Sequence, residues 1–248
     1  MRYIALTCEA LARSLYAAAA TSPHAVTVRL FKQGLHNRPK NLRATLQEQV
    51  DAIEPGECDA ILLVYGMCGN ATVGLQARHT PLVIPRAHDC IALYLGSLQR
   101  YQTEFERHPG TYWYSVDYLE RMEPGASVAL GAAGIEAEEA EYERLVTKFG
   151  QETADAIMEE MRGWMRHYSR AAFIDTGLGD PDPVARLAQQ KAESEGWVFE
   201  RLQGDRRLLN MLAHGQWPED EFLIVPPGHE IEQALSDGVM RARKSGAE

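Results

Sequence analysis

Two short apolar runs, each soon followed by a thiol, constrain the fold of this 248-residue chain more than any other feature. The first is Ala60–Val64, which leads into Tyr-Gly-Met-Cys68, and the second is Leu82–Ile84, which leads into Pro-Arg-Ala-His-Asp-Cys90. Aliphatic runs of this length, bounded by turn residues, are typical of strands buried on both faces, as in parallel sheets. Open α/β sheets bind their ligands at the carboxyl ends of such strands. We therefore expect the working end of the protein where these two strands end.

The rest of the chain alternates between strand-like and helix-like segments, which predicts an α/β fold with mostly parallel sheets. Strands are expected over residues 2–7, 24–31, 60–64, 82–84, 171–175, 197–202 and 222–225. Because the order of elements after residue 170 matches the opening order, we expect two similar lobes with a ligand cleft at the strand carboxyl ends. The predicted domains are a first lobe over 1–108, an aromatic segment and helical linker over 109–169, and a second lobe over 170–248.

Charge and hydropathy restrict the partners. The formal net charge of −10 argues against a nucleic-acid partner, which needs a basic face, although a local basic patch survives that argument. No apolar run approaches the roughly 20 residues that a membrane span requires. The amino terminus runs straight into a strand pattern without a signal-peptide cleavage site, so we expect a cytoplasmic protein.

All four cysteines lie in the first ninety residues. In a reducing cytosol they are not expected to form disulfides. Cys8, Cys68 and Cys90 each follow an apolar run, so a parallel sheet would bring all three to one edge. Cys58 precedes its strand and belongs at the opposite edge, so we leave it out of the site.

Three thiolates are suitable ligands for a soft or borderline metal, and they leave a fourth position for substrate. A [4Fe–4S] cluster with one open iron would use the same three ligands. The absence of a C-x₂-C pair disfavours structural zinc, and the glycines at 66 and 69 leave room for a group larger than one ion. This favours a cluster, with catalytic zinc as the alternative. The predicted site comprises the metal ligands Cys8, Cys68 and Cys90, the catalytic residues His88, Asp175 and His36, and the substrate-binding residues Arg86, Asn70, Tyr65, Thr176, Gly177 and Asp205.

Other interpretations remain open. Cys68 or Cys90 can be a nucleophile without any metal, although the placement of every cysteine in one lobe counts against a two-lobe cysteine pair. The glycines at 177 and 179 can cradle an anion on backbone N–H groups, but no G-x-G-x-x-G or P-loop pattern is present. Asp175 and Asp205 also suit a capping role, Asp205 at the start of the helix that follows it.

Five stretches, taken in order, resemble the bacterial and archaeal family known as domain of unknown function 1638. They are Val64-Tyr-Gly-Met-Cys-Gly-Asn70, Leu82-Val-Ile-Pro-Arg-Ala-His-Asp-Cys-Ile91, Pro109-Gly-Thr-Tyr-Trp113, Phe173-Ile-Asp-Thr-Gly-Leu-Gly-Asp180 and Val225-Pro-Pro-Gly228. Members of that family tend to be encoded near corrinoid-dependent methyltransferases, so the resemblance implies a one-carbon context without supplying a reaction.

Together these observations predict a metal- or iron–sulfur-dependent enzyme, a transferase or lyase, that acts on a small methylated or sulfur-containing molecule. The alternative is a non-catalytic accessory or carrier protein for a corrinoid methyltransferase system. The expected partners are a small-molecule substrate and a corrinoid protein or methyltransferase, with no nucleic acid and no membrane.

Overall fold

The computed structural model describes residues 1–122, 130, 138–165, 167–234 and 239–246. The chain divides into two compact units. The first combines Met1–Tyr101 with Asp205–Glu248, and the second is Gln102–Gly204. The fold is α/β with mostly parallel sheets, as the sequence predicts. No helix in the described part of the chain is both long and apolar enough to cross a membrane.

The first unit contains a five-stranded sheet in the order β2-β1-β3-β4-β8. Its strands are β1 (Arg2–Cys8), β2 (Ala25–Phe31), β3 (Ala60–Val64), β4 (Leu82–Pro85) and β8 (Phe222–Val225). The first four strands run parallel, and β8 runs antiparallel to β4. Every residue of β3 and β4 is buried, as expected for aliphatic strands in the centre of a parallel sheet.

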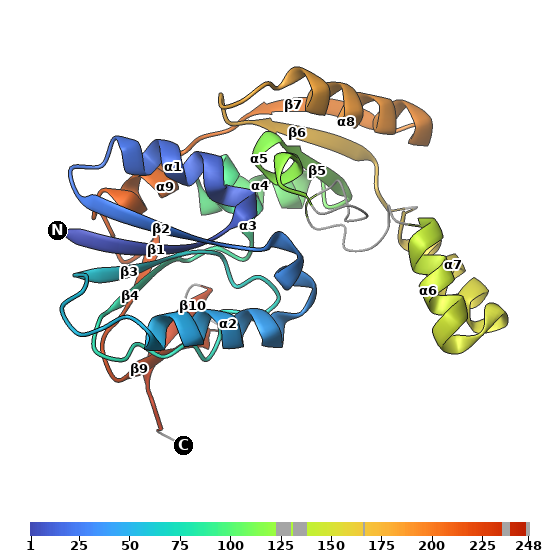
Figure 1. Cartoon of the computed structure of the whole chain (residues 1–248). Helices are drawn as coiled ribbons and strands as arrows, with labels where there is room; N and C mark the ends of the chain where they lie inside the picture. The colour runs from blue at the N-terminus through green and yellow to red at the C-terminus, as the bar shows by residue number, and fades with distance from the viewer. Residues whose placement is uncertain (123–129, 131–137, 166, 235–238, 247–248) are drawn as a thin grey trace. The chain divides into compact units, whose positions relative to one another are not determined.

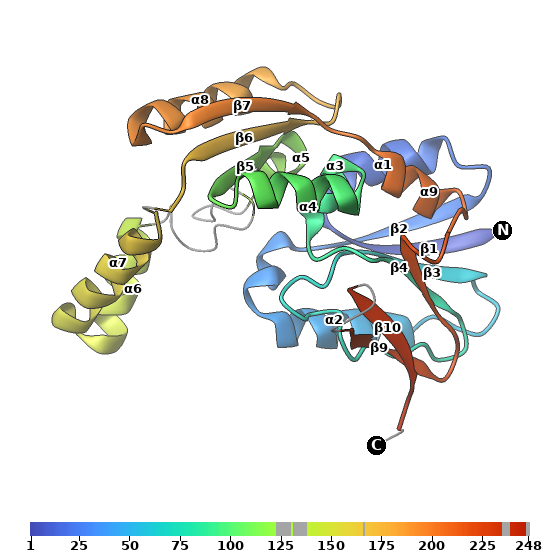
Figure 2. The same cartoon turned by 180° about the vertical axis from the view of Figure 1, so that it is seen from behind.

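Helices cover both faces of this sheet (Figures 1 and 2). One face carries α1 (Ala12–Ala20) and α9 (Arg207–Ala213), and the other carries α2 (Pro39–Asp51). The shorter elements of the unit are η1 (Glu9–Leu11), η2 (Gln33–Asn37), α3 (Cys90–Leu95), and the antiparallel pair β9 (His229–Gln233) and β10 (Met240–Lys244). The helix α4 (Leu98–Arg107) crosses the boundary between the units.

The second unit contains a three-stranded parallel sheet in the order β5-β6-β7. Its elements are β5 (Thr111–Ser115), α5 (Val116–Glu120), α6 (Glu138–Phe149), α7 (Gln151–Met165), β6 (Arg170–Asp175), α8 (Asp182–Glu195) and β7 (Val198–Gln203). The aromatic stretch forms the buried strand β5, and Tyr112 and Tyr114 pack with Phe173 in the core of this unit. The aromatic side chains of this segment therefore pack in the core of the second unit.

The unit boundaries differ from the predicted ones. Residues 205–248 return to the first unit because β8 pairs with β4, placing Leu82 opposite Val225. The segment assigned to a linker contains β5, which pairs with β6 and so belongs to the second sheet. The two sheets have five and three strands, so the predicted likeness of the lobes is limited to their strand–helix alternation. The predicted ligand cleft stays a prediction.

Candidate functional site

The carboxyl ends of β1, β3 and β4 bring three thiols together. The parallel register places Thr7 opposite Val64, so both strands end at the same edge of the sheet, and β4 follows beside β3. The thiols of Cys8, Cys68 and Cys90 lie close enough for each to interact electrostatically with the other two. Cys8 and Cys68 are buried, and Cys90 is partly exposed.

The loops after β3 and β4 are joined directly through their backbones. The Met67 N–H donates to the Ala87 carbonyl at 2.9 Å, and the Cys68 N–H donates to the His88 carbonyl at 3.0 Å. A Cβ at Gly66 would lie 2.7 Å from the backbone nitrogen of Asp89, closer than real Cβ atoms approach. Glycine at 66 is therefore what permits the two thiol-bearing loops to touch.

The Cys68 loop has an unusual backbone. Cys68 has φ +47° and Asn70 has φ +67°, a left-handed conformation that residues with a side chain seldom adopt. The Cys68 carbonyl accepts from the Ala71 N–H at 3.2 Å, and the buried Thr72 hydroxyl donates to the Gly66 carbonyl at 3.2 Å. Strain of this kind persists where the surrounding structure enforces it and concentrates at functional sites.

Burial keeps these thiols protonated. It raises the pKa of Cys8 to about 12, with an added contribution from Glu9, although the Ala10 N–H that donates to the sulfur lowers it. Burial likewise raises the pKa of Cys68 to about 12 and that of Cys90 well above its usual value, and the neighbouring thiols add to both. A thiol with such a pKa is a poor nucleophile at neutral pH. The arrangement thus offers little to a metal-free cysteine nucleophile.

His36 lies beside Cys8, as expected. Its Nδ1 is 3.7 Å from the Cys8 Sγ and 3.1 Å from the Gln33 carbonyl oxygen. Because a carbonyl only accepts, Nδ1 carries the hydrogen in that bond, and Nε2 is left with a lone pair. Burial lowers the pKa of His36, although the bond to Gln33 opposes this, so the imidazole is neutral at pH 7. A histidine whose other nitrogen donates to a carbonyl is typical of metal sites.

Two buried polar side chains near this edge have no partner among the described residues. Tyr65 is 1% exposed and its hydroxyl makes no hydrogen bond there, while burial and the thiols of Cys8 and Cys68 hold its pKa well above the usual value. Its ring lies 6.0 Å from the His36 ring. Gln33, 6% exposed, has both amide atoms unpartnered. Buried polar groups normally find a partner, so each points to a group that binds there.

Asp89 fixes the position of Cys90. Its Oδ1 accepts from the Ile91 N–H at 2.9 Å and caps α3, and its Oδ2 accepts from the Tyr101 hydroxyl at 2.9 Å. Burial raises the pKa of Asp89 although both bonds lower it. Sequence reasoning did not find Tyr101 or Gln33, because neither is part of a motif. Only their positions in the folded chain show that they belong to the site.

The structure gives two of the predicted residues other roles. The Arg86 guanidinium donates to the carbonyls of Glu219 and Met240, so it holds the carboxyl-terminal segment. The His88 side chain is exposed, and its carbonyl serves the contact with Cys68. Neither observation tests the predicted roles in substrate binding and catalysis.

The predicted residues of the second unit form a small closed network. The Asp175 carboxylate accepts from Arg201 at 2.6 Å and from the Gly177 N–H at 2.9 Å, so one of the two N–H groups expected to cradle an anion already binds a carboxylate of this chain. Burial raises the pKa of Asp175, but these bonds outweigh it and the net shift is downward. Thr176, beside it, is buried.

Asp205 belongs to the first unit, where its carboxylate accepts from the Arg207 N–H at 2.8 Å at the start of α9. The N-cap residue of α9 is Arg206, so Asp205 bonds to the first turn from one residue ahead of the capping position that the sequence predicts for it.

Cys58 lies apart from the three thiols, at the amino-terminal side of β3. Burial raises its pKa, and the charges that act on it are those of Glu57, Asp59 and Arg29 rather than those of other cysteines. Within the described ranges, no three side chains of His, Cys, Asp or Glu are grouped so as to hold a metal ion as they stand.

Comparison with known families places the chain. The family described as "Protein of unknown function (DUF1638)" matches residues 30–213. The chain belongs to this family. No curated protein and no solved structure matches it. Because the family's description names no activity, the function has to be argued from the site.

Proposed function

We propose that Cys8, Cys68 and Cys90 bind a [4Fe–4S] cluster or a zinc ion, and that the protein is an enzyme that uses this centre on a small methylated or sulfur-containing molecule. One observation carries the proposal: three interacting thiols share a buried sheet edge with the unpartnered Tyr65 hydroxyl. Thiols of this kind repel one another once ionised, and a cation relieves that repulsion. The residues therefore suit a positively charged, sulfur-loving group.

Two kinds of group suit three thiolate ligands. A zinc ion would take the three thiolates and keep its fourth position open for substrate. A [4Fe–4S] cluster would bind the same three cysteines and leave one iron open. Metal analysis distinguishes the two.

The side chains around the thiols suit proton handling. When bound, a metal with an open position polarises a substrate oxygen or activates a thiolate. The neutral His36 imidazole keeps its Nδ1–H on the side of Cys8 and can accept a proton at Nε2, and the Tyr65 hydroxyl stays protonated and is available as a hydrogen-bond donor. The buried ends of β1 and β3 exclude water from that side.

The wider setting completes the proposal. Thiols remain reduced in a cytoplasm, and we place the protein there. The resemblance of the chain to its family supports a corrinoid protein or methyltransferase as partner. A carrier that only holds the bound group has the same ligands, so turnover of a candidate methylated substrate is the measurement that separates a carrier from an enzyme.

The test is metal analysis of protein purified without oxygen, with Cys68→Ser compared against Cys58→Ser. Several irons with labile sulfide and a broad brown absorbance indicate a cluster, and one zinc without colour indicates the single-ion alternative. We expect Cys68→Ser, Cys8→Ser and Cys90→Ser to lose the group and Cys58→Ser to retain it. Protein that carries neither metal after anaerobic reconstitution, or equal loss in all four variants, overturns the proposal.

A further inference from the structure

A depression of about 510 Å³ lies where the first turn of α2 meets the Cys68 loop. Its size is within the range of pockets for small molecules. The residues that line it are Arg38, Pro39, Lys40, Asn41, Arg43 and Gly69. The lining therefore includes three cations and no carboxylate.

The positive charge of this pocket is not neutralised by the chain. In the part that the structure describes, Arg38 and Lys40 are exposed and have neither an ion pair nor a side-chain hydrogen bond. Arg43 donates to the Asn70 carbonyl at 2.9 Å, and its buried Nε has no acceptor. By contrast, Asp51 at the carboxyl end of α2 forms an ion pair with Arg78. The whole chain has 35 acidic and 25 basic residues and is therefore negatively charged. This pocket, with three cations that have no ion pair among the described residues, is a positively charged patch on that chain.

The backbone adds to this charge. The helix α2 is 13 residues long and begins with Pro39 at its first turn, and no side chain caps its amino end. The partial positive charge of that end therefore remains available to an anion. Gly69 has φ +64°, and a Cβ there would lie 3.6 Å from the Pro39 ring, so a side chain at this position would partly fill the pocket.

The pocket is next to the thiol centre. Gly69 directly follows Cys68, and Arg43 holds the same loop through Asn70. An anionic group in the pocket is thus one residue from a predicted ligand of the bound metal.

We propose that this pocket binds an oxyanion, a carboxylate or a phosphate, of the substrate that reacts at the thiol centre. Arginine forks and a lysine are suited to either group through charge-assisted hydrogen bonds. The inference rests on the proposed function for its link to chemistry, but the binding of the anion is separable from it. The substrate is accordingly a small acid rather than a neutral or cationic compound.

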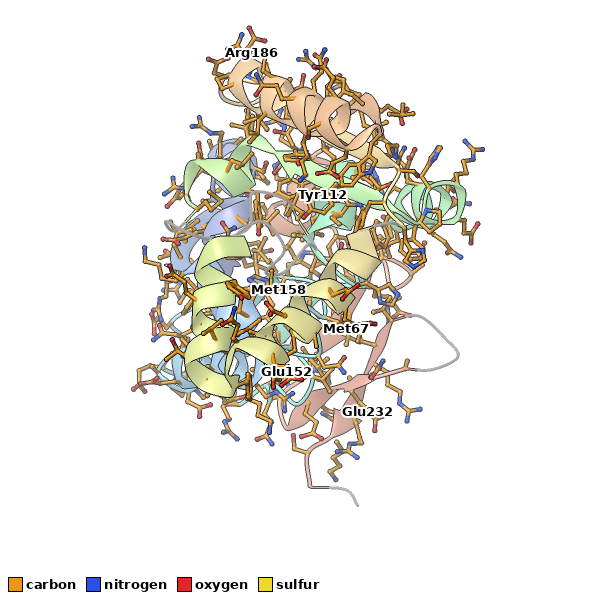
Figure 3. All side chains as sticks on the ribbon, turned by 90° about the vertical axis from the view of Figure 1, so that its right-hand side faces the viewer. Met67, Tyr112, Glu152, Met158, Arg186 and Glu232 are labelled. Atoms are coloured by element: carbon orange, nitrogen blue, oxygen red, sulfur yellow. The ribbon has the colours of Figure 1, made fainter. Side chains whose placement is uncertain are left out.

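The test is a nuclear magnetic resonance titration of the full chain with inorganic phosphate and, separately, with acetate. We expect saturable shifts at the amides of Gly69 and Lys40, and an affinity about tenfold weaker for each cation removed in Arg38→Ala and Lys40→Ala. Arg186→Ala is the matched control, because Arg186 is an exposed arginine on α8 in the second unit without an ion pair among the described residues (Figure 3). Saturation by only one of the two anions identifies which group the pocket takes.

Absence of saturable shifts with both anions, or an equal loss in Arg186→Ala, overturns the pocket. Metal analysis of the Arg38→Ala, Lys40→Ala double variant separates the two proposals. Full metal content with lost anion binding supports the pocket as a site distinct from the thiols. If the chain binds the anion but takes up no metal, the proposed anion pocket is supported and only the proposed metal site is refuted.

Discussion

Replacing Gly66 with alanine tests whether the contact between the two thiol-bearing loops is real. The new Cβ would lie 2.7 Å from the Asp89 nitrogen and 2.8 Å from both the Ala87 oxygen and the His88 carbonyl carbon. All three are backbone atoms, which cannot rotate away as a side chain can. The loops must therefore separate, which stretches the hydrogen bonds from Met67 and Cys68 across the same contact.

The expected magnitude follows from these contacts. Overpacking a filled site costs about 1–3 kcal/mol. Weakening two backbone hydrogen bonds adds about 1 kcal/mol. With a urea dependence of about 2 kcal/mol per molar, a loss of about 2–4 kcal/mol lowers the unfolding midpoint by about 1–2 M. Because Cys68 and Cys90 lie on opposite sides of the contact, Gly66→Ala should also bind less metal.

The assay is urea unfolding followed by circular dichroism, with metal analysis of the same samples. Gly163→Ala is the control, since no described atom lies within 4 Å of a Cβ there and the position is inside α7. Alanine in a helix is favoured over glycine by about 1 kcal/mol, so this control should not lower the midpoint. An unchanged midpoint in Gly66→Ala would refute the reasoning, because it would mean that the loops are not in contact.

Three further substitutions follow from the same geometry. Tyr65→Phe removes a buried hydroxyl that has no partner among the described residues. Metal-free protein should therefore unfold at the same or a higher urea concentration, while metal retention or substrate affinity falls. A clear loss of metal-free stability would show that the hydroxyl already has a partner. Asp89→Ala removes the cap of α3 and the acceptor of the Tyr101 hydroxyl. We expect the free energy of unfolding to fall by about 1–2 kcal/mol and metal binding through Cys90 to weaken, measured by the same unfolding and metal assays. Full metal affinity would contradict the role of Asp89 in positioning Cys90. Asp175→Asn should cost about 1 kcal/mol at pH 7, measured by urea unfolding, with no effect on metal content. The pKa of Asp175 is lower in the folded than in the unfolded protein. Its contribution to stability is therefore present above the unfolded pKa near 4 and disappears as the pH falls through the lower folded value. An equal loss of stability in Asp175→Asn at pH 7 and at pH 2 would contradict this reasoning.

The sequence predicts the strands of the first sheet well because their signal is local. The aliphatic runs at 60–64 and 222–225 match β3 and β8 in their limits, and α2 begins at Pro39, a residue favoured in the first turn of a helix. The convergence of three thiols follows from parallel strand direction alone. The direction of β8 could not be predicted in this way, because it depends on pairing between residues far apart in the chain.

Breaks within helical stretches are harder to predict from the sequence. The spacing of Leu93, Leu95 and Leu98 indicates a single helix over 91–105, but Gly96, which has φ +70° and packs against the Asp205 carbonyl, divides this stretch into α3 and α4. That contact joins the middle of the chain to its last part. Similarly, the bond from Tyr101 to Asp89, the burial of the Gln33 amide and the grouping of Arg38, Lys40 and Arg43 around one pocket are seen only when distant segments are placed together. The local hydrophobic pattern of the sequence does not predict them.

The return of residues 205–248 to the first unit has a consequence for the order in which the protein is made. The second unit is continuous in sequence, so its three strands are complete before the last segment leaves the ribosome. The sheet that bears the thiols gains its β8 edge only after synthesis passes residue 225. Until then β4 presents an open edge, and domains generally fold as complete units. The nascent chain therefore has its inserted unit complete before the β8 edge of the thiol-bearing sheet is in place.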